Sequence, residues 1–177
     1  MPGRSGIRAK RKGQIALRNV RSSDASQVAE LMTELGYPTS TLQMASRLRI
    51  IGASQDYHSI VAVERKRTVG FVGAMIGRAY ERDEPHGRII VLVVRGTHRR
   101  RGIGTLLVAA AEEWLNRRGA VGCAVNSGKS RSDAHRFYAS LGYQATGTRF
   151  ARAVGSTSDH AHGPRQPGLQ LSASVRR

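Results

Sequence analysis

Residues 98–107, with the sequence HRRRGIGTLL, combine the residue types that bind an anion. Positive charge comes from three consecutive arginines, Arg99, Arg100 and Arg101. Glycines at positions 102 and 104 leave the backbone amides uncovered by side chains. A helical apolar pattern begins directly afterwards, so the free amides and the positive dipole of a helix start fall at the same place. The stretch therefore predicts a phosphate or pyrophosphate site, and the competing interpretation is a solvated basic turn.

The surrounding sequence predicts the elements that must position this stretch. Apolar and β-branched runs predict strands at 14–20, 58–66, 68–80, 87–94 and 120–125, and a closing strand or hairpin at 143–154. Periodicity with start and stop signals predicts helices at 22–38, 39–52, 102–119 and 132–142. We therefore expect an α+β fold: a central, mostly antiparallel sheet of six to seven strands, flanked by four helices.

Composition limits the class of protein. The chain has 177 residues, of which 40% are apolar, and this suits one compact domain. We place that domain at residues 14–153, between a basic tail at 1–13 and a tail at 154–177, both predicted to be disordered. No apolar run reaches the roughly 20 residues that span a bilayer. A single cysteine, Cys123, excludes a disulfide framework and a Cys-rich metal site, so we expect a cytoplasmic protein without a metal.

The formal net charge of +17 favours a polyanionic ligand. Such a ligand is either a nucleotide cofactor or a nucleic acid. Five Tyr, three Phe and one Trp offer few platforms for base stacking, which argues against single-strand binding as the main role.

Two motifs, one at Arg99, Gly102 and Gly104 and the other within residues 134–143, together resemble the GNAT superfamily, the acetyl-CoA-dependent N-acyltransferases. The family's Arg/Gln-x-x-Gly-x-Gly/Ala motif is matched at Arg99, Gly102 and Gly104. Its Ala-x-x-Phe-Tyr-x-x-x-Gly-Tyr/Phe motif is matched at Ala134, Phe137, Tyr138, Gly142 and Tyr143. Either motif alone is weak, whereas both together, separated by a predicted helix and strand, are specific. The resemblance covers residues 15 to about 153 in element order.

The resemblance implies where acetyl-CoA binds. The pyrophosphate is expected on the amides of residues 99–104, and the pantetheine arm along the strand at 92–94, where this strand and the next splay apart. A ligand in that gap would also satisfy the hydrogen bonds of an exposed strand edge. The implied cofactor-binding residues are Leu92, Val93, Val94, Arg99, Arg100, Arg101, Gly102, Ile103, Gly104, Thr105, Arg131, Ala134 and Phe137.

The resemblance also implies a catalytic role for Tyr138, as proton donor to the departing thiolate. A phenol with a pKa of about 10 stays protonated at neutral pH and can donate. The alternative is a core or interface tyrosine. Arg131 stands where the family often has Asn, and an arginine there can reach a cofactor phosphate or carbonyl.

The sequence lacks the family's usual base. Many relatives carry Glu in the strand before the glycine loop, where this chain has Ile90. An amine with a pKa of about 10.4 is mostly protonated at pH 7, so its proton needs another route. Candidate replacements lie in the acidic loop before that strand: Glu81 and Glu84, with Asp83 and His86 beside them. The alternative for these residues is a solvated hairpin turn.

We therefore expect an N-acetyltransferase in which a primary amine attacks acetyl-CoA directly in a ternary complex. Cys123 lies in an apolar run without a neighbouring His, so it is expected to be structural and not a nucleophile. Small amines, aminoglycoside-like polyamines, protein amino termini and lysines all stay open as acceptors, and so do a monomer and a homodimer. The alternative function is a nucleic-acid-binding module that uses the basic face of a degenerate acyl-CoA fold.

Overall fold

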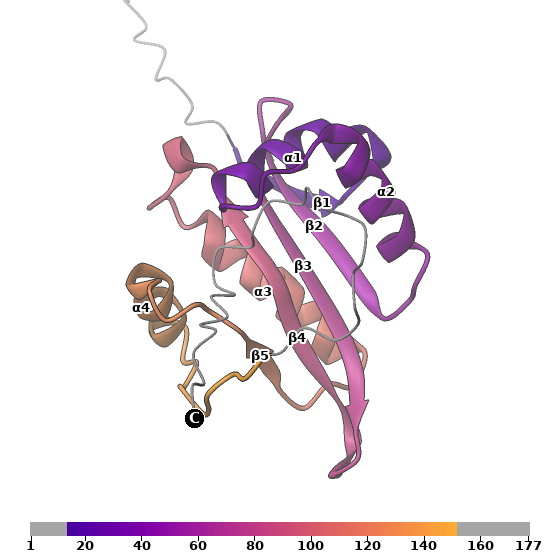
Figure 1. Cartoon of the computed structure of the whole chain (residues 1–177), viewed down its shortest axis with the longest axis vertical. Helices are drawn as coiled ribbons and strands as arrows, with labels where there is room; N and C mark the ends of the chain where they lie inside the picture. The colour runs from indigo at the N-terminus through magenta and orange to yellow at the C-terminus, as the bar shows by residue number, and fades with distance from the viewer. Residues whose placement is uncertain (1–13, 152–177) are drawn as a thin grey trace, which may run out of the picture.

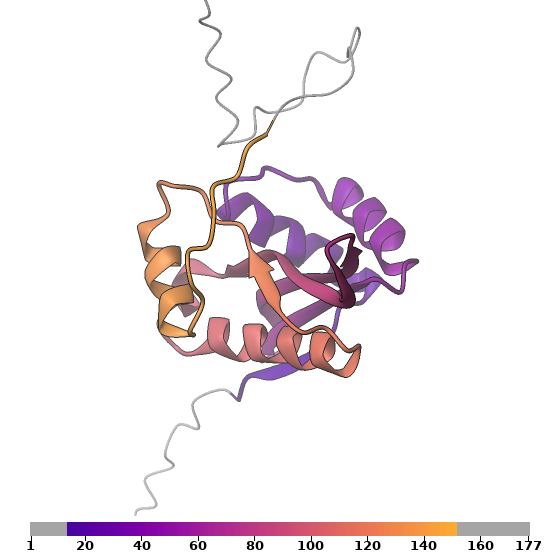
Figure 2. The same cartoon turned by 90° about the horizontal axis from the view of Figure 1, so that it is seen from below.

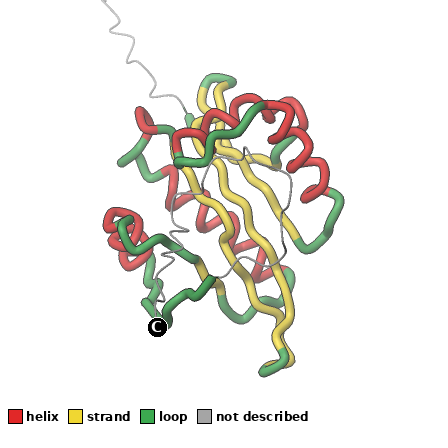
Figure 3. The backbone as a smooth tube through the Cα atoms, viewed as in Figure 1, coloured by secondary structure: helices red, strands yellow, loops and turns green. Residues whose placement is uncertain are grey.

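Five strands form one mixed sheet in the computed structural model, which describes residues 14–151 (Figures 1 and 3). In spatial order they are β1 (Ala16–Asn19), β2 (Tyr57–Glu64), β3 (Arg67–Ala79), β4 (Arg82–Val94) and β5 (Cys123–Val125). The pairs from β1 to β4 are antiparallel, and β5 runs parallel to β4. The long β3–β4 hairpin extends beyond the rest of the sheet at the bottom of Figure 1.

Helices cover both faces of the sheet (Figure 2). On one face lie α1 (Ala25–Glu34), which follows the short 3-10 helix η1 (Ser22–Asp24), and α2 (Thr41–Gly52). On the other face lies α3 (Ile103–Arg117), which follows β4 and the 3-10 helix η2 (Gly96–His98). The last helix, α4 (Ser132–Ser140), stands beside the β4–β5 side of the sheet.

The core under α3 is the larger of the two. The apolar stripe of this helix, with the period of three and four residues visible in the sequence, buries Ile103, Leu107 and Leu115 against β3 and β4. Gly87 of β4 has no room for a side chain, since a Cβ there would lie 2.5 Å from Leu115. The core under α1 and α2 is smaller and ends on β4 at the half-buried Val91.

The predicted fold class is confirmed, but two details of the prediction were wrong. The described residues form five strands and not six to seven. The predicted closing strand from residue 143 is not a strand over 143–151, because almost all of this stretch is exposed, including Phe150 at 91%, and no apolar face holds it against a partner. Residues 152–154 of that prediction and both predicted tails, at 1–13 and 154–177, lie outside the described residues. No helix within residues 14–151 is long and apolar enough to cross a bilayer.

Candidate active site

The sheet is open along the second half of β4. Strand β5 pairs with β4 only at Gly87, Arg88 and Ile89. On its other side, β4 stays paired with β3 as far as Val94. From residue 90 onward, β4 therefore has no partner on the β5 side within the described chain. The two strands part here, as the resemblance implied.

The unpaired edge presents the backbone of Leu92 and Val94. The amide of Arg95 donates to the carbonyl of Val69 on β3 at 2.9 Å. Backbone polar groups alternate between the two sides of a strand, so Val93 also faces β3 while Leu92 and Val94 face the open side. Extended backbone with donors and acceptors free on one side is what the amide-rich pantetheine arm requires.

A β-bulge marks the start of the open edge. Ile89 pairs with Ala74 and Val91 pairs with Gly73, so Ile90 is the extra residue on β4. Ile90 is 43% exposed. The position at which the family often has a catalytic Glu is therefore an accessible apolar side chain beside the opening.

The glycine loop lies at the head of this edge. Arg100 and Gly102 both adopt positive φ, at 60° and 76°. Gly102 caps α3 without any side-chain cap, and the first helical hydrogen bond runs from Leu106 to the Gly102 carbonyl. The amides of residues 102–105 are consequently left for an anion, with the helix dipole behind them.

The two glycines serve different purposes. A Cβ on Gly102 would meet no atom within 4 Å, so the left-handed backbone is what favours glycine there. A Cβ on Gly104 would lie 3.1 Å from the Phe137 ring, so this glycine also lets α4 pack on the first turn of α3. Only the Gly102 position is constrained by the loop alone.

The three loop arginines have separate positions. The Arg99 Nε donates to the Val94 carbonyl at 3.3 Å, on the open edge. Arg101 is held by Glu64 of β2 through bonds of 2.6 and 3.2 Å, and this bond holds the pKa of the Glu64 carboxyl below its usual range. The Arg101 guanidinium therefore fastens the loop to β2, which leaves Arg99 and Arg100 as the arginines nearer to a ligand.

Tyr138 of α4 lies between two aromatic rings, one on the same helix and one just after it. Its ring meets Phe137 edge-on at 5.2 Å and Tyr143 at 5.5 Å between centroids. Burial raises the pKa of Tyr138 to about 12; the nearby Cys123 acts in the same direction and Arg131 opposes it. The Tyr143 hydroxyl donates to Glu112 of α3 at 2.6 Å, and burial also raises its pKa. Phe137 packs inward against the α3 core, as predicted.

Arg131 and Ala134 place α4 next to the open edge. The Arg131 guanidinium donates to the Leu35 carbonyl at the end of α1, at 2.9 Å. The contact joins α4 to α1 across the opening, so this arginine already has a backbone partner. Ala134, one turn before Tyr138, is half-buried.

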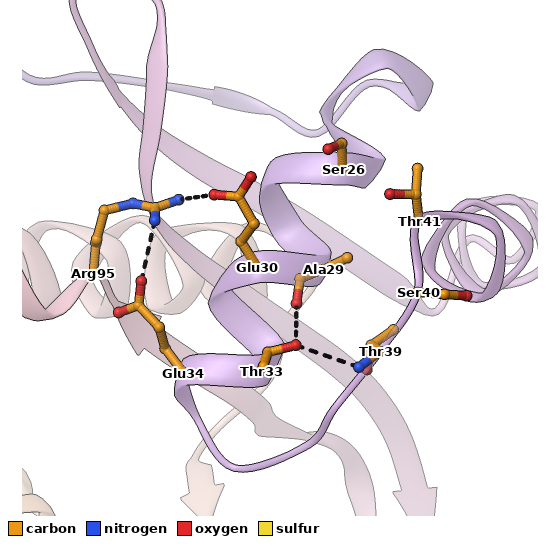
Figure 4. A pocket seen from close by; sticks show the side chains of 9 residues that line it. All are labelled: Ser26, Ala29, Glu30, Thr33, Glu34, Thr39, Ser40, Thr41 and Arg95. Carbon is orange, nitrogen blue, oxygen red and sulfur yellow. Dashed lines mark hydrogen bonds and ion pairs between the residues drawn. The ribbon is translucent and has the colours of Figure 1, made fainter.

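Sequence reasoning missed the anchor at the end of β4. Arg95 is 7% exposed, and its guanidinium pairs with Glu30 at 2.9 Å and Glu34 at 3.1 Å on α1 (Figure 4). Glu34 also accepts the Gly96 amide at 2.8 Å. These bonds fix the start of the glycine loop to α1. Two glutamates four residues apart on one helix face were the available signal, but nothing local indicates their partner.

The same residues border an open pocket of about 560 Å³ on the outer side of α1. Hydroxyl groups supply much of its remaining lining: Ser26, Thr33, Thr39, Ser40 and Thr41 (Figure 4). None of the predicted site residues lines this pocket, and both of its glutamates are already paired with Arg95.

The structure does not bring Glu81 or Glu84 to the glycine loop. Both are exposed at the tip of the β3–β4 hairpin, at the opposite end of β4. Glu84 is six residues from Ile90, which corresponds to about 20 Å along a strand. A group that takes a proton directly must lie within hydrogen-bond reach, and this placement does not favour either carboxylate for that task.

Cys123 is half-buried on β5, and burial raises the pKa of its thiol. A thiol held protonated is a poor nucleophile, in agreement with the structural role expected for it. Within residues 14–151 no cluster of three His, Cys, Asp or Glu residues is placed to hold a metal ion.

Solved structures share this fold. A GNAT family acetyltransferase from Staphylococcus aureus is 25% identical, with a TM-score of 0.68 over 79% of this chain and 98% of its own. An aminoglycoside N-acetyltransferase, AAC(6')-Iy, solved with CoA, is 20% identical with a TM-score of 0.71, over 81% of this chain and 97% of its own. Another aminoglycoside acetyltransferase comes from an uncultured soil metagenomic sample and was solved with sisomicin. It is 18% identical with a TM-score of 0.69, over 80% of this chain and 97% of its own.

The comparison with curated proteins gave no match. The family model described as the acetyltransferase (GNAT) family matches residues 26–143, which include the open edge of β4, the glycine loop and the aromatic helix α4. With both motifs in the places that the resemblance requires, the chain belongs to the GNAT acetyltransferase family.

Proposed function

We propose that the protein transfers the acetyl group of acetyl-CoA to a primary amine, by direct attack in a ternary complex. The observation that carries the proposal is the unpaired edge of β4, which begins at the bulge of Ile90 and ends at the uncapped start of α3. This edge offers backbone hydrogen bonds to an extended arm and amides to a pyrophosphate in one continuous line.

Different residues of the chain bind different parts of acetyl-CoA. The amides of residues 102–105 face the pyrophosphate, and Arg99 and Arg100 add positive charge. Leu92 offers its backbone groups to the pantetheine arm, and Val94 offers its amide, because its carbonyl already accepts from the Arg99 Nε. The acyl end then points toward the bulge, because the opening closes where Ile89 pairs with Val125.

Tyr138 stabilises the leaving sulfur by donating a hydrogen bond. Its pKa of about 12 keeps the phenol protonated. A thiol has a pKa of about 8.5, so complete transfer of the phenolic proton to the thiolate would be uphill. The proton that ends on sulfur is therefore the one that the amine nitrogen loses as the C–N bond forms and the C–S bond breaks. Tyr138 lowers the barrier by stabilising charge on sulfur, in the manner of an oxyanion-hole donor.

Position 90, where the family often has a glutamate, is an isoleucine and cannot take a proton. The amine therefore arrives neutral or loses its proton to water. The rate should accordingly rise with pH as the neutral fraction of the acceptor rises. The raised pKa of Cys123 argues against an acetylated cysteine intermediate and favours direct attack.

The test uses the intact chain. Calorimetry should show acetyl-CoA binding, and mass spectrometry should show a gain of one acetyl group on an amine when acetyl-CoA is present. The neighbours solved with CoA and with sisomicin make an aminoglycoside one of the acceptors to test, beside amino acids and short peptides. Absence of acetyl-CoA binding, together with oligonucleotide that co-purifies under native conditions, would favour the nucleic-acid-binding alternative.

A further inference from the structure

We infer that the preferred acceptor carries an anionic group, such as a carboxylate, close to the amine that is acetylated, and that Arg88 binds this group. The inference rests on the proposed function and adds the chemical class of the acceptor.

Arg88 lies directly beside the point where the open edge begins. It pairs with Ala124 of β5 and with Met75 of β3, one position before the last β4–β5 pair at Ile89. The acyl end of the cofactor points to this closing pair. Among the residues of β4 that are paired on both sides, only Ile89 is nearer to the bulge.

The Arg88 side chain projects on the face that carries α1 and α2. Its neighbour Ile89 is buried in the core under α3, and successive side chains of a strand point to opposite faces. The partner strand gives the same result. Ile76 of β3 is also buried under α3, so its neighbour Met75, which pairs with Arg88, points to the α1 and α2 face. Helices α1 and α2 cover the sheet only as far as Val91, so Arg88 is exposed there (Figure 1).

No carboxylate stands beside Arg88 on this face of the described chain. The residues around it on the same face are small or uncharged, apart from a histidine: Gly73, Met75, Gly77, His86, Ile90 and Ala124. By contrast, Arg95 pairs with two glutamates and Arg101 with one. The guanidinium of Arg88 makes no ion pair with any described residue, so its donors are available to a ligand.

An exposed guanidinium here selects acceptors by charge. It offers a planar pair of donors that match a carboxylate. The same charge repels polyamines, and the acids of the hairpin tip cannot offset it, because Glu84 is about 13 Å away along the strand and Arg78 and Arg82 lie beside them. An amine with a neighbouring carboxylate is therefore favoured over a polycation such as an aminoglycoside.

The experiment compares matched acceptors that differ by one charge. One pair is an amino acid and its amide. The second pair is two short peptides with amidated carboxyl ends and free α-amines, one beginning with Asp and one with Asn. The two pairs distinguish a small acceptor from a peptide acceptor. We expect kcat/KM to favour the carboxylate member of at least one pair by about tenfold in the unmodified protein.

Two variants that change the net charge equally distinguish an effect of the Arg88 site from an effect of the net charge of the protein. Arg88→Glu should abolish or reverse the preference. Arg117→Glu, an exposed position on α3 on the opposite face of the sheet, should keep it. Acetyl-CoA affinity of both variants should match that of the unmodified protein. Arg117→Glu should lower Tm slightly, because it replaces the exposed pair with Glu113 by two like charges in the last turn of α3.

The outcomes that overturn the inference differ from those that overturn the proposed function. Equal rates for both members of each pair, faster transfer to aminoglycosides, or a preference that survives Arg88→Glu would each reject the role of Arg88. So would acetyl-CoA binding with transfer to neither member of either pair. Failure to bind acetyl-CoA at all would instead reject the acetyltransferase itself.

Discussion

The two ends of β4 differ in what surrounds them. At the hairpin end, β4 pairs with β3 and, at residues 87–89, also with β5, and its acids are exposed to solvent. At the other end, residues 91–94 pair on one side only and lead into the uncapped start of α3. At residues 87–89, where β5 is present, the β4 backbone is paired on both sides, whereas at residues 91–94 one side of it is left for a ligand or water.

The difference shows that an abundance of charged side chains is a weaker sign of a site than unsatisfied backbone. The hairpin tip holds Glu81, Asp83 and Glu84, but Arg78 binds the Asp83 carbonyl and the tip points away from the rest of the chain. At the open end, ion pairs hold the glycine loop in place: Arg95 with Glu30 and Glu34, and Arg101 with Glu64. Preorganisation of this kind is typical of a binding site.

The strongest test of the open end is Tyr138→Phe. Loss of the hydroxyl removes the hydrogen bond to the leaving sulfur, and turnover should fall by about 10²–10³ with little change in acetyl-CoA affinity. Steady-state kinetics and calorimetry measure the two quantities. Because the Tyr138 pKa is about 12, the phenol stays protonated through neutral and moderately alkaline pH. Activity of the unmodified protein should therefore show no loss from this group below about pH 11.

Tyr143→Phe is the matched control for that change. This hydroxyl donates to Glu112 inside the protein, so its removal should lower stability more than turnover. Equal loss of turnover in both variants would mean that Tyr138 acts through packing, and the assignment of the leaving-group donor would fail.

Gly102→Asp tests the anion site, with an effect expected to be smaller. An aspartate at the start of α3 places negative charge where the pyrophosphate is proposed to bind, and acetyl-CoA affinity should fall by about tenfold or more. Gly142→Asp is the control, because Gly142 also has positive φ, at 87°, and open space around its Cβ position. Both variants strain the left-handed backbone by about 1–2 kcal/mol. The helix dipole favours an aspartate at the start of α3 and disfavours one at the end of α4, so Gly142→Asp should be the less stable variant. A similar loss of acetyl-CoA affinity in both variants would show that the glycine loop is not the pyrophosphate site.

Glu34→Gln tests the anchor of the loop. Glu34 accepts from both Arg95 and the Gly96 amide, and a glutamine would turn an NH₂ group toward one of these donors. We expect a loss of about 1 kcal/mol, or about 2–4 °C in Tm, with weaker acetyl-CoA binding. Glu113→Gln breaks only an exposed pair with Arg117, and its Tm should change by less. Should the two variants melt alike, the Arg95 contacts would have no special part in holding the loop.

The sequence allowed the local parts of the site to be predicted but not the contacts between distant segments. The glycine loop and the aromatic helix follow from residues that are close in the chain, and both were placed correctly in the fold. The Arg95 anchor joins residues more than sixty positions apart, and the Arg101–Glu64 pair joins residues 37 apart. The closing strand was predicted from short apolar alternation around Gly147, which proved too weak without a partner strand to bury it.

The smallest effect is expected at the hairpin end. Neutralising the tip with Glu81→Gln, Asp83→Asn and Glu84→Gln together leaves the backbone bond from Arg78 to the Asp83 carbonyl in place. The tip lies farther from Ile90 than the Debye length of about 10 Å at 0.1 M salt, so its charges are largely screened at the site. We expect kcat/KM for an amine acceptor to change by less than about threefold, with the pH–rate profile unmoved. Kinetics at low and high salt decide the question: a deficit that disappears with added salt would indicate steering by the tip, and one that persists at every ionic strength would make these carboxylates proton acceptors after all. Either result would show that both ends of β4 serve the reaction.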